Sequence, residues 1–437
     1  MSKRFHIKTF GCQMNERDSE TLAGMLSELG YDQTEDKKEA DVAIINTCSV
    51  RDNADKRFFG TLGQLKKKKE QNPEFTVCVC GCMMQQQHII DEVKSKYPWV
   101  DIIFGTHNIH EFPKLLSSVI SEKQKVIDVW DAGGEIVEGL PVKRMYRHKA
   151  YVNIMFGCNN FCTYCIVPYT RGRERSRGAE EIIQEVKELV KDGVKEVTLL
   201  GQNVNSYHSG TMDFADLIYK INEIEGLERI RFMTSHPKDL SDKLIKAYVD
   251  CEKLCNYIHL PVQSGSNNIL KKMNRKYQVE DYLAIIEKLR IAVPDITVST
   301  DIIVGFPGET EEDAEETLKL AQKVGFDSAF TFIYSPRKGT PAEKYTEQVP
   351  EEIKHKRFNR LVEEIKRSSA EKNKAYEGKT IKVLVESLSK KDKKTLSGRS
   401  EGYKLVDLQG DESLIGQIVQ VEILEGKTFS LFGKLSK

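Results

Sequence analysis

The run GCNNFCTYC at residues 157–165 brings three thiols, Cys158, Cys162 and Cys165, into one short segment. A [4Fe-4S] cluster is usually held by four cysteine thiolates, and this run supplies three with no obvious fourth. One iron would then keep an open coordination position, which is typical of metal centres that do chemistry and not of those that only hold a fold together. The spacing therefore predicts a cluster whose open position takes a small chelating cofactor.

The run resembles the cluster motif of the radical S-adenosylmethionine enzymes, in which the amino and carboxylate groups of that cofactor fill the open position. A zinc knuckle or three buried structural thiols are the alternatives, since unpaired cysteines are often buried. A zinc site would require a fourth ligand nearby at a familiar spacing, and none follows Cys165. We therefore favour a [4Fe-4S] cluster, and we assign no side chain as a general acid or base.

The composition is balanced in charge, with 66 Lys and Arg residues against 66 Asp and Glu residues in a chain of 437. A general polyanion-binding surface is therefore not expected, and any contact with nucleic acid should come from local basic patches. The N-terminal residues lack the apolar core of a signal peptide, and no long apolar segment suggests a membrane span. We expect a cytoplasmic protein, in which cysteines more often serve metal binding or catalysis than disulfides.

Three fold units are expected along the chain. Short apolar runs alternate with amphipathic stretches at the N-terminus, which predicts an open α/β domain with a mainly parallel sheet. Its strands are expected at 5–10, 42–46, 75–79 and 100–104, and its helices at 16–29, 54–70 and 86–96. A linker is expected at about 132–148.

A second βα series follows, with strands expected at 152–156, 197–200, 230–233, 257–260, 296–304 and 328–334 and helices such as 180–191 and 279–291. Six βα units predict a partial (β/α)6 barrel with its active site at the C-terminal ends of the strands. The pattern then becomes all-β, with strands expected at 380–386, 402–408, 417–424 and 428–432, which predicts a small β-barrel of the oligonucleotide-binding type. The predicted domains are 3–131, 144–374 and 377–437.

A second cysteine trio is expected in the N-terminal domain, because Cys12, Cys48 and Cys82 each follow a predicted strand. In a parallel sheet those strand ends share one edge, where open α/β folds bind ligands. The three thiols are thus expected to converge on a second cluster with a spare iron, and structural thiols are the alternative.

Four other cysteines are weighed against these ligands. Cys78 and Cys80 complicate the choice of the third ligand, because alternation along a strand places them on the same face as Cys82. Burial accounts for both of them adequately. Cys251 and Cys255, spaced i and i+4 at the end of a helical stretch, are expected in the core.

With both trios in view, the chain resembles the methylthiotransferase family of radical S-adenosylmethionine enzymes from end to end. The motifs that carry this resemblance are KTFGCQMN at 8–15, NTCSVR at 46–51, GCMMQ at 81–85, GCNNFCTYCIVPYTRGRE at 157–174 and GQNVN at 201–205. Within the family, GCQMN and GQNVN are similar to the branch that acts on isopentenyladenosine in tRNA. The C-terminal barrel resembles a TRAM domain, an RNA-binding module.

The resemblance implies two [4Fe-4S] clusters, one that binds S-adenosylmethionine on Cys158, Cys162 and Cys165, and an auxiliary one on Cys12, Cys48 and Cys82. It implies conversion of N6-isopentenyladenosine next to the tRNA anticodon to its 2-methylthio derivative, by a 5′-deoxyadenosyl radical and with two S-adenosylmethionine molecules per turnover. The alternatives are a methylthiotransferase acting on threonylcarbamoyl-adenosine in tRNA or on a ribosomal protein. An alternative of another class is a non-catalytic metal-binding RNA adaptor.

Weaker signals extend the candidate sites. Cofactor contacts are expected from residues at strand ends, Gly201, Gln202, Asn203, Gln263, Ser264, Asp301 and Gly305, although a glycine after a strand often only permits a turn. RNA contacts are expected from two basic runs, Arg171, Arg173, Arg175 and Arg177, and Lys390, Lys391, Lys393 and Lys394, since arginine forks suit phosphate oxygens. A solvated loop with salt bridges to Glu174 is the alternative for the arginines. Residues 310–313 are expected to begin a helix with a capping box and to have no other role.

The expected partners are a tRNA substrate and an electron donor such as a flavodoxin or a ferredoxin. No membrane contact is expected, and the chain is expected to be a monomer.

Overall fold

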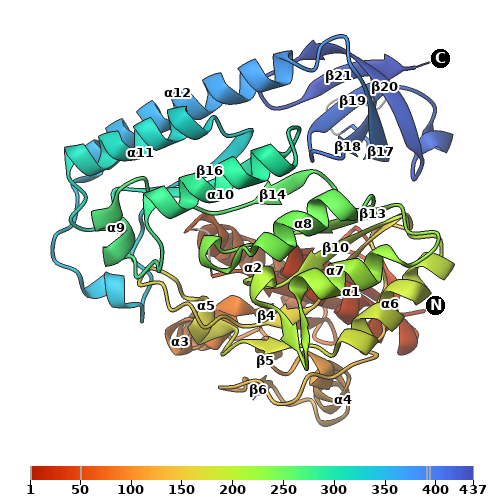
Figure 1. The fold of residues 1–437 in the computed structure, drawn as a ribbon. Helices are drawn as coiled ribbons and strands as arrows, with labels where there is room; N and C mark the ends of the chain where they lie inside the picture. Colours follow the sequence, from red (N-terminus) through yellow and green to blue (C-terminus); the bar gives the residue numbers. More distant parts are fainter. Residues whose placement is uncertain (1, 50–51, 390–391, 393–394, 437) are drawn as a thin grey trace. The chain divides into compact units, whose positions relative to one another are not determined.

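The computed structural model describes residues 2–49, 52–389, 392 and 395–436, and its ribbon is drawn in Figure 1. Contacts divide the chain into two compact units. The first unit is Met1–Met145, Met155–Phe161 and Cys165–Arg177, and the second is Tyr146–Ile154, Cys162–Tyr164 and Gly178–Lys437. The cysteine run at 157–165 therefore contributes residues to both units, which the predicted boundary at residue 144 does not anticipate.

The first unit is built on a parallel sheet of six strands in the order β2-β1-β3-β4-β5-β6. The strands are β1 (Arg4–Thr9), β2 (Asp32–Gln33), β3 (Val42–Thr47), β4 (Thr76–Gly81), β5 (Ile102–Phe104) and β6 (Val126–Asp128). The helices are α1 (Gln13–Glu28), α2 (Asp52–Gln71), α3 (Gln87–Lys96) and α4 (Phe112–Glu122), with short 3-10 turns η1 (Cys82–Gln85) and η2 (Ile109–Glu111). The open parallel sheet expected from the sequence is thus present, and α4, β2 and β6 add to the expected elements.

Both faces of this sheet are covered by apolar side chains. Its central strands β3 and β4 are therefore buried along their whole length. Alternate residues separate into two clusters, one containing Ile44 and Cys78 and the other containing Ile45 and Val79. Cys78 and Cys80 both belong to the first cluster and are fully buried. β4 ends at Gly81, so the strand alternation that placed Cys82 on their face does not reach that residue.

The first unit also contains three short elements from the region of the cysteine run, β8 (Met155–Phe156), α5 (Val167–Thr170) and β9 (Arg175–Ser176). The strand expected at 152–156 is therefore split. Residues 149–153 form β7 of the second unit, whereas β8 pairs antiparallel with β9 in the first.

The second unit begins with six strands in two parallel three-stranded sheets, β13-β10-β7 and β14-β15-β16. The strands are β7 (Lys149–Asn153), β10 (Glu196–Leu200), β13 (Arg229–Phe232), β14 (Tyr257–His259), β15 (Thr297–Val304) and β16 (Ser328–Ile333). An isolated parallel bridge joins Ile230 of β13 to Leu254, which precedes β14. This partial barrel agrees with the expected fold, and each expected strand overlaps an observed one.

Helices alternate with these strands and provide the outer layer of the partial barrel. They are α6 (Ala179–Lys191), α7 (Phe214–Asn222), α8 (Asp242–Asp250), α9 (Asn267–Lys272), α10 (Val279–Ala292), α11 (Glu311–Val324) and α12 (Glu351–Lys374). Small connecting elements are η3 (Val204–Ser206), β11 (His208–Ser209), β12 (Met212–Asp213), η4 (Pro237–Asp239) and η5 (Pro341–Lys344). The predicted capping box at Thr310 and Asp313 is confirmed at the start of α11. α8 ends at Asp250, so Cys255 is not on the helix as expected, although it and Cys251 are both buried.

The C-terminal residues close a five-stranded barrel in the order β17-β18-β19-β21-β20. Its elements are β17 (Thr380–Leu388), β18 (Thr395–Ser400), β19 (Leu405–Gln409), η6 (Glu412–Leu414), β20 (Ile418–Gly426) and β21 (Leu431–Leu435). The sequence predicts a small barrel but misses β18, because its Ser397-Gly398 pair beside a lysine run has the composition of a loop.

Two buried arginines of β13 bind the backbone of the C-terminal barrel. Arg229 donates to the carbonyls of Arg399 and Lys382, and Arg231 donates to those of Ser400 and Glu401. Within the described residues, no helix is both long and apolar enough to cross a membrane.

Candidate iron-sulfur and cofactor sites

The first cysteine trio lies at the C-terminal edge of the six-stranded sheet. Cys12 directly precedes α1, whereas Cys48 and Cys82 directly follow β3 and β4. β1, β3 and β4 are neighbours, and Thr47 pairs with Gly81, so the register sets Cys48 beside Cys82. Three thiols that are far apart in the sequence are therefore gathered at one sheet edge, where open α/β folds bind ligands.

Two glycines let these strand ends approach one another. A Cβ atom on Gly11 would lie 2.6 Å from the Cβ of Cys48, and one on Gly81 would lie 2.4 Å from the carbonyl oxygen of Thr47. Both glycines also have positive φ angles, +126° and +95°, which side chains disfavour. A larger residue at either position would push the cysteine-bearing loops apart.

Asn15 fixes the same edge through hydrogen bonds. Its Nδ2 donates to the carbonyls of Phe10 and Thr47, at 3.0 and 2.7 Å, and its backbone carbonyl accepts from Nδ2 of Asn46 at 2.9 Å. Asn15 and Asn46 are both almost fully buried. The asparagines of the KTFGCQMN and NTCSVR motifs thus hold the loops that carry Cys12 and Cys48.

A buried guanidinium reaches this trio from the segment after the cysteine run. Nε of Arg171 donates to Sγ of Cys82 at 3.2 Å, and Nη2 donates to Asp18 and Asn15. Burial would lower the pKa of Arg171, but the negative charges of Asp18, Cys82 and Cys12 outweigh it and the pKa is raised. Burial raises the pKa of the Cys82 thiol, and Arg171 opposes that rise.

The cysteine run itself is held on both sides by backbone and side-chain contacts. In the first unit, the amide of Cys158 donates to the carbonyl of Gly172 at 3.2 Å, and Nδ2 of Asn160 lies 3.4 Å from Sγ of Cys158. In the second unit, the amide of Thr163 donates to Met273 and its carbonyl accepts from Ala342. Cys162 is buried, and Cys158 and Cys165 are partly exposed.

A second buried arginine contacts this trio, and sequence reasoning missed it. Nη1 of Arg275 donates to Sγ of Cys162 at 3.5 Å, while Nε donates to Tyr277 and Nη2 to the carbonyl of Pro261. Its charge also reaches His236, whose pKa is lowered to about 2 by burial first and by Arg275 second. A lone arginine in a loop has no local pattern that could have marked it.

Polar atoms without a hydrogen-bond partner among the described residues gather at the C-terminal ends of neighbouring strands. Oδ1 of Asn203, which follows β10, and Oγ of Ser235, which follows β13, are both buried and have no hydrogen-bond partner among the described residues. Nδ2 of Asn203 is bound to Asp239 at 2.7 Å, so the side chain is fixed with its oxygen unsatisfied. Buried polar groups are normally paired, so such atoms fit contacts to a ligand.

The same part of the second unit also carries strained backbone. Positive φ angles occur at the non-glycine residues Thr234 after β13, Gln263 after β14 and Asn274 before Arg275. In the first unit, Phe161 of the cysteine run also has a positive φ angle. Such conformations cost free energy and persist where the surrounding structure enforces them, often at ligand sites. They were not visible in the sequence.

Comparison with known proteins identifies the family. The chain is 57% identical over 436 residues to the tRNA-2-methylthio-N(6)-dimethylallyladenosine synthase of Clostridium perfringens, covering 99% of this chain and 98% of the relative. It is 56% identical to the synthase of the same name from Clostridioides difficile, covering 99% and 91%. The chain belongs to this synthase family.

Family models match three parts of the chain. They are the uncharacterized protein family UPF0004 at 4–105, the radical SAM superfamily at 152–321 and the TRAM domain at 374–436. The chain is therefore a radical S-adenosylmethionine enzyme, and its family uses a [4Fe-4S] cluster and S-adenosylmethionine.

Solved structures confirm the fold of the larger part of the chain. The methyltransferase TsrM from Kitasatospora setae is similar with a TM-score of 0.57 at 14% identity, covering 78% of this chain and 77% of that one. The radical enzyme OxsB is similar with a TM-score of 0.53 at 13% identity, covering 79% and 55%. At these identities the similarity concerns the fold alone.

The arginines expected to form one RNA-binding patch do not share an exposed surface. Arg171 and Arg177 are buried, and Arg177 forms an ion pair with Glu138. Arg175 donates to the carbonyl of Gly134, and Arg173 is exposed above the ring of Phe161 at 4.4 Å. Alternate positions in an irregular loop do not fix which side chains face solvent, so spacing alone misjudged this set. Lys390, Lys391, Lys393 and Lys394 lie outside the described residues.

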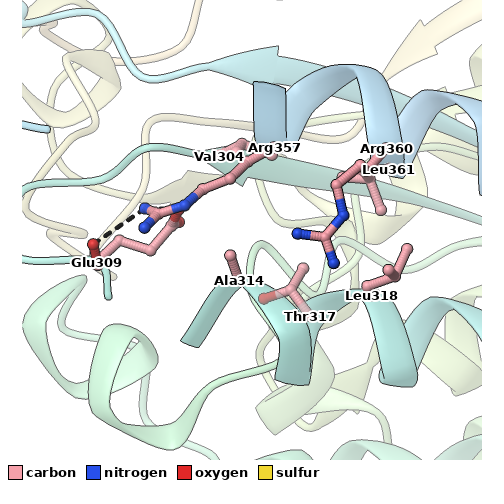
Figure 2. Close-up of a pocket in the computed structure, with 8 residues that line it drawn as sticks. All are labelled: Val304, Glu309, Ala314, Thr317, Leu318, Arg357, Arg360 and Leu361. Atoms are coloured by element: carbon pink, nitrogen blue, oxygen red, sulfur yellow. Dashed lines mark hydrogen bonds and ion pairs between the residues drawn. The ribbon is translucent and has the colours of Figure 1, made fainter. Parts of the chain in front are cut away.

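Two expected cofactor residues have structural partners. Oγ of Ser264 lies 3.3 Å from Oγ1 of Thr317 in α11. The amide of Gly305 donates to the carboxylate of Glu309 at 3.0 Å, and Figure 2 shows Arg357 of α12 paired with the same carboxylate. These bonds fix the turns after β14 and β15.

The remaining expected residues lie at or near strand ends, as their positions in the sequence predicted. Gly201, Gln202 and Asn203 directly follow β10, and Gln263 forms a bridge to Ile302. Asp301 lies inside β15 and not after it, with its carboxylate 3.5 Å from Nε2 of His259. Their contacts to a cofactor stay predictions.

The donor sets fit the groups that the family uses. Each trio offers three thiols of which at least one accepts a hydrogen bond from a buried arginine, and the unsatisfied oxygens of Asn203 and Ser235 suit a polar cofactor. Across the described ranges, no three His, Cys, Asp or Glu side chains are arranged to hold a single metal ion.

Proposed function

We propose that this chain converts N6-isopentenyladenosine next to the tRNA anticodon to its 2-methylthio derivative. The observation that carries this proposal is the 57% identity to a synthase named for that product over 99% of the chain. The substrate carbon bears a strong, non-acidic C–H bond, so no general base could ionise it. When bound, the family's cluster and S-adenosylmethionine supply the one-electron chemistry that such a bond requires.

The side chains described above bind and orient these groups. Cys158, Cys162 and Cys165 hold the cluster, and Arg275 orients the buried Cys162 thiolate and offsets its charge. Asn203 and Ser235 bind the polar part of S-adenosylmethionine at the ends of β10 and β13. Gly201, Gln202, Gln263, Asp301 and Gly305 line the same ends of the strands, of which Gly305 supplies shape only, because its amide is bound to Glu309.

A second [4Fe-4S] cluster on Cys12, Cys48 and Cys82 is part of the proposal. These three thiols would hold that cluster, which would supply the sulfur, and the methyl group would come from a second S-adenosylmethionine per turnover. The gathering of three thiols at the edge of β1, β3 and β4, with glycines that keep the loops close, supports this second site.

The proposal includes the partners and the compartment. A tRNA binds through the C-terminal barrel, which matches the TRAM domain family. It also contacts Arg173 and the lysines at 390–394. A flavodoxin or ferredoxin donates electrons, and the protein acts as a monomer in the cytoplasm.

Mass spectrometry of tRNA nucleosides tests this function. A strain lacking the gene should accumulate N6-isopentenyladenosine, and the purified, anaerobically reconstituted protein should convert it to a nucleoside heavier by one SCH2 unit. Unchanged isopentenyladenosine with a missing methylthio group on threonylcarbamoyl-adenosine, or on a ribosomal protein, would reassign the substrate. Zinc without acid-labile sulfide in the purified protein would favour a non-catalytic RNA adaptor.

A further inference from the structure

The side chain of Arg171 is almost fully buried, with only 5% of it exposed, whereas an arginine in a surface loop is usually exposed. Burying a charge is costly unless it is paired and hydrogen-bonded. Asp18, at 6% exposure, provides the opposite charge at 2.7 Å from Nη2. The pair is thus electrically balanced without any contribution from the cysteines.

The contact with sulfur needs a separate explanation. Nε of Arg171 lies 3.2 Å from Sγ of Cys82, while Nη2 serves Asp18 and Asn15. A structural salt bridge accounts for Nη2 but not for Nε, which is directed at a cysteine of the auxiliary trio. Asn15, the third partner, itself binds the loops that carry Cys12 and Cys48.

The backbone around Arg171 is fixed at both sides. Oγ1 of Thr106 donates to the carbonyl of Thr170 at 2.8 Å, and the carbonyl of Gly172 accepts from the amide of Cys158 at 3.2 Å. All of these residues belong to the first unit. Arg171 therefore connects a sulfur of one trio to the short segment that begins at Cys165 of the other.

We propose that Arg171 is a positioning residue of the auxiliary cluster, which holds the Cys82 sulfur with Nε and anchors the segment after Cys165 to the same sheet edge. This inference rests on the second cluster of the proposed function. A hydrogen bond to a ligand sulfur stabilises the reduced cluster and raises its reduction potential. Arg171 thus sets both the place of Cys82 and the potential of the auxiliary cluster.

The test uses the full-length chain in which Cys158, Cys162 and Cys165 are replaced by alanine, so that only the auxiliary cluster remains after anaerobic reconstitution. Its reduction potential is measured by a spectroelectrochemical titration in which electron paramagnetic resonance reports the reduced cluster. Arg171→Lys keeps the ion pair with Asp18 but lacks the fork that reaches Cys82. Arg171→Gln combined with Asp18→Asn removes both charges without leaving either one buried alone.

The matched control is Arg177→Lys, because Arg177 is a buried arginine of the same segment that pairs with Glu138 and not with sulfur. We expect a more negative potential in both Arg171 variants and an unchanged potential in the control. Selective loss of about four irons per chain in the Arg171 variants, with an unchanged thermal unfolding curve, would also support the proposal.

Three results would overturn it. An unchanged potential in both Arg171 variants would remove the role of Arg171 and leave the cluster in place. Unfolding of the whole chain in both variants would make Arg171 a structural residue only. Absence of iron from the starting protein would instead remove the second cluster of the proposed function, and the role of Arg171 with it.

Discussion

The two cysteine trios are assembled in opposite ways. Cys158, Cys162 and Cys165 come from one short run, whereas Cys12, Cys48 and Cys82 come from loops after three neighbouring parallel strands. The first set is visible in the sequence as a spacing, and the second becomes a set only through the sheet topology. A local motif can therefore identify a cofactor, but a distributed site requires the fold.

The arginine beside each trio differs in how its charge is balanced. Arg171 is paired with the carboxylate of Asp18, whereas Arg275 donates to Tyr277, to a backbone carbonyl and to Cys162. None of these three partners of Arg275 is a carboxylate, so its charge lacks the counter-ion that Arg171 has, although its distance to sulfur, 3.5 Å, is longer than the 3.2 Å of Arg171. Loss of Arg275 should disturb its trio more than loss of Arg171 disturbs the auxiliary trio.

The largest expected effect separates the two trios by removing one thiol from each. Cys162→Ala should abolish formation of 5′-deoxyadenosine, because the cluster that binds S-adenosylmethionine loses a ligand. Cys82→Ala should retain 5′-deoxyadenosine formation and lose the methylthio product. Liquid chromatography with mass detection measures both products in one reaction, and the same outcome for both variants would contradict separate roles.

Removal of the Arg275 charge comes next. Arg275→Gln should lower the rate of 5′-deoxyadenosine formation by about 10- to 100-fold, the range seen when a partner of a metal ligand is lost. Arg171→Gln with Asp18→Asn should change this rate less, because it acts on the other trio. Equal effects of the two changes on S-adenosylmethionine cleavage would show that the charge balance is irrelevant.

A third buried arginine sharpens the comparison, because it contacts no cysteine sulfur in its hydrogen bonds to Glu196, Ser400 and Glu401. Arg231→Gln should destabilise the second unit by about 3–5 kcal/mol, since it removes the nearest partner of the buried Glu196 carboxylate. Urea unfolding followed by circular dichroism measures this. Arg231→Gln with Glu196→Gln is the control and should recover part of the loss, while the iron content of folded protein stays unchanged.

The same pair predicts a pH dependence. Burial would raise the pKa of Glu196, but Arg231 and Arg229 outweigh it, so the pKa lies below its ordinary value of 4.5. A lowered pKa in the folded state contributes stability above pH 4.5, and this contribution is lost as the pH falls through the folded pKa. As the pH is lowered from 7 into the acid range, the urea midpoint should fall more steeply for the unaltered chain than for Glu196→Gln. Parallel curves would contradict the ionised pair.

The smallest effect is expected at the exposed arginine of the segment. Arg173→Ala should weaken tRNA binding because it removes one phosphate contact. The slope of log K against log salt concentration should therefore become shallower by about one. Filter binding at several salt concentrations measures the slope. Arg177→Ala, which alters a buried arginine of the same segment, should leave the slope unchanged, and an altered slope only in that variant would reverse the assignment.

The sequence predicted elements with strong local patterns. The parallel sheet and the strands of the partial barrel follow from apolar runs and turns, and the capping box at Thr310 follows from its spacing. Strand β18 was missed because Ser397-Gly398 has the composition of a loop, and the arginine patch was wrong because an irregular loop has no period that fixes exposure. Spacing also placed Cys255 on a helix that ends at Asp250.

Long-range contacts account for what the sequence could not show. Arg171 reaches Asp18 across 153 positions, and Arg275 reaches Cys162 across 113. Neither contact leaves a local spacing, because each depends on how distant loops meet at the ends of strands. The strained residues Thr234 and Gln263 are similarly set by their surroundings and not by their own propensities.

Mössbauer spectroscopy of protein reconstituted with 57Fe tests the central claim most directly, since it counts [4Fe-4S] clusters in the unaltered chain and in two variants. One variant lacks Cys12, Cys48 and Cys82, and the other lacks Cys158, Cys162 and Cys165. We predict two clusters in the unaltered chain and one in each variant. A single cluster in the unaltered chain that survives the removal of either trio's thiols would contradict the two-site account.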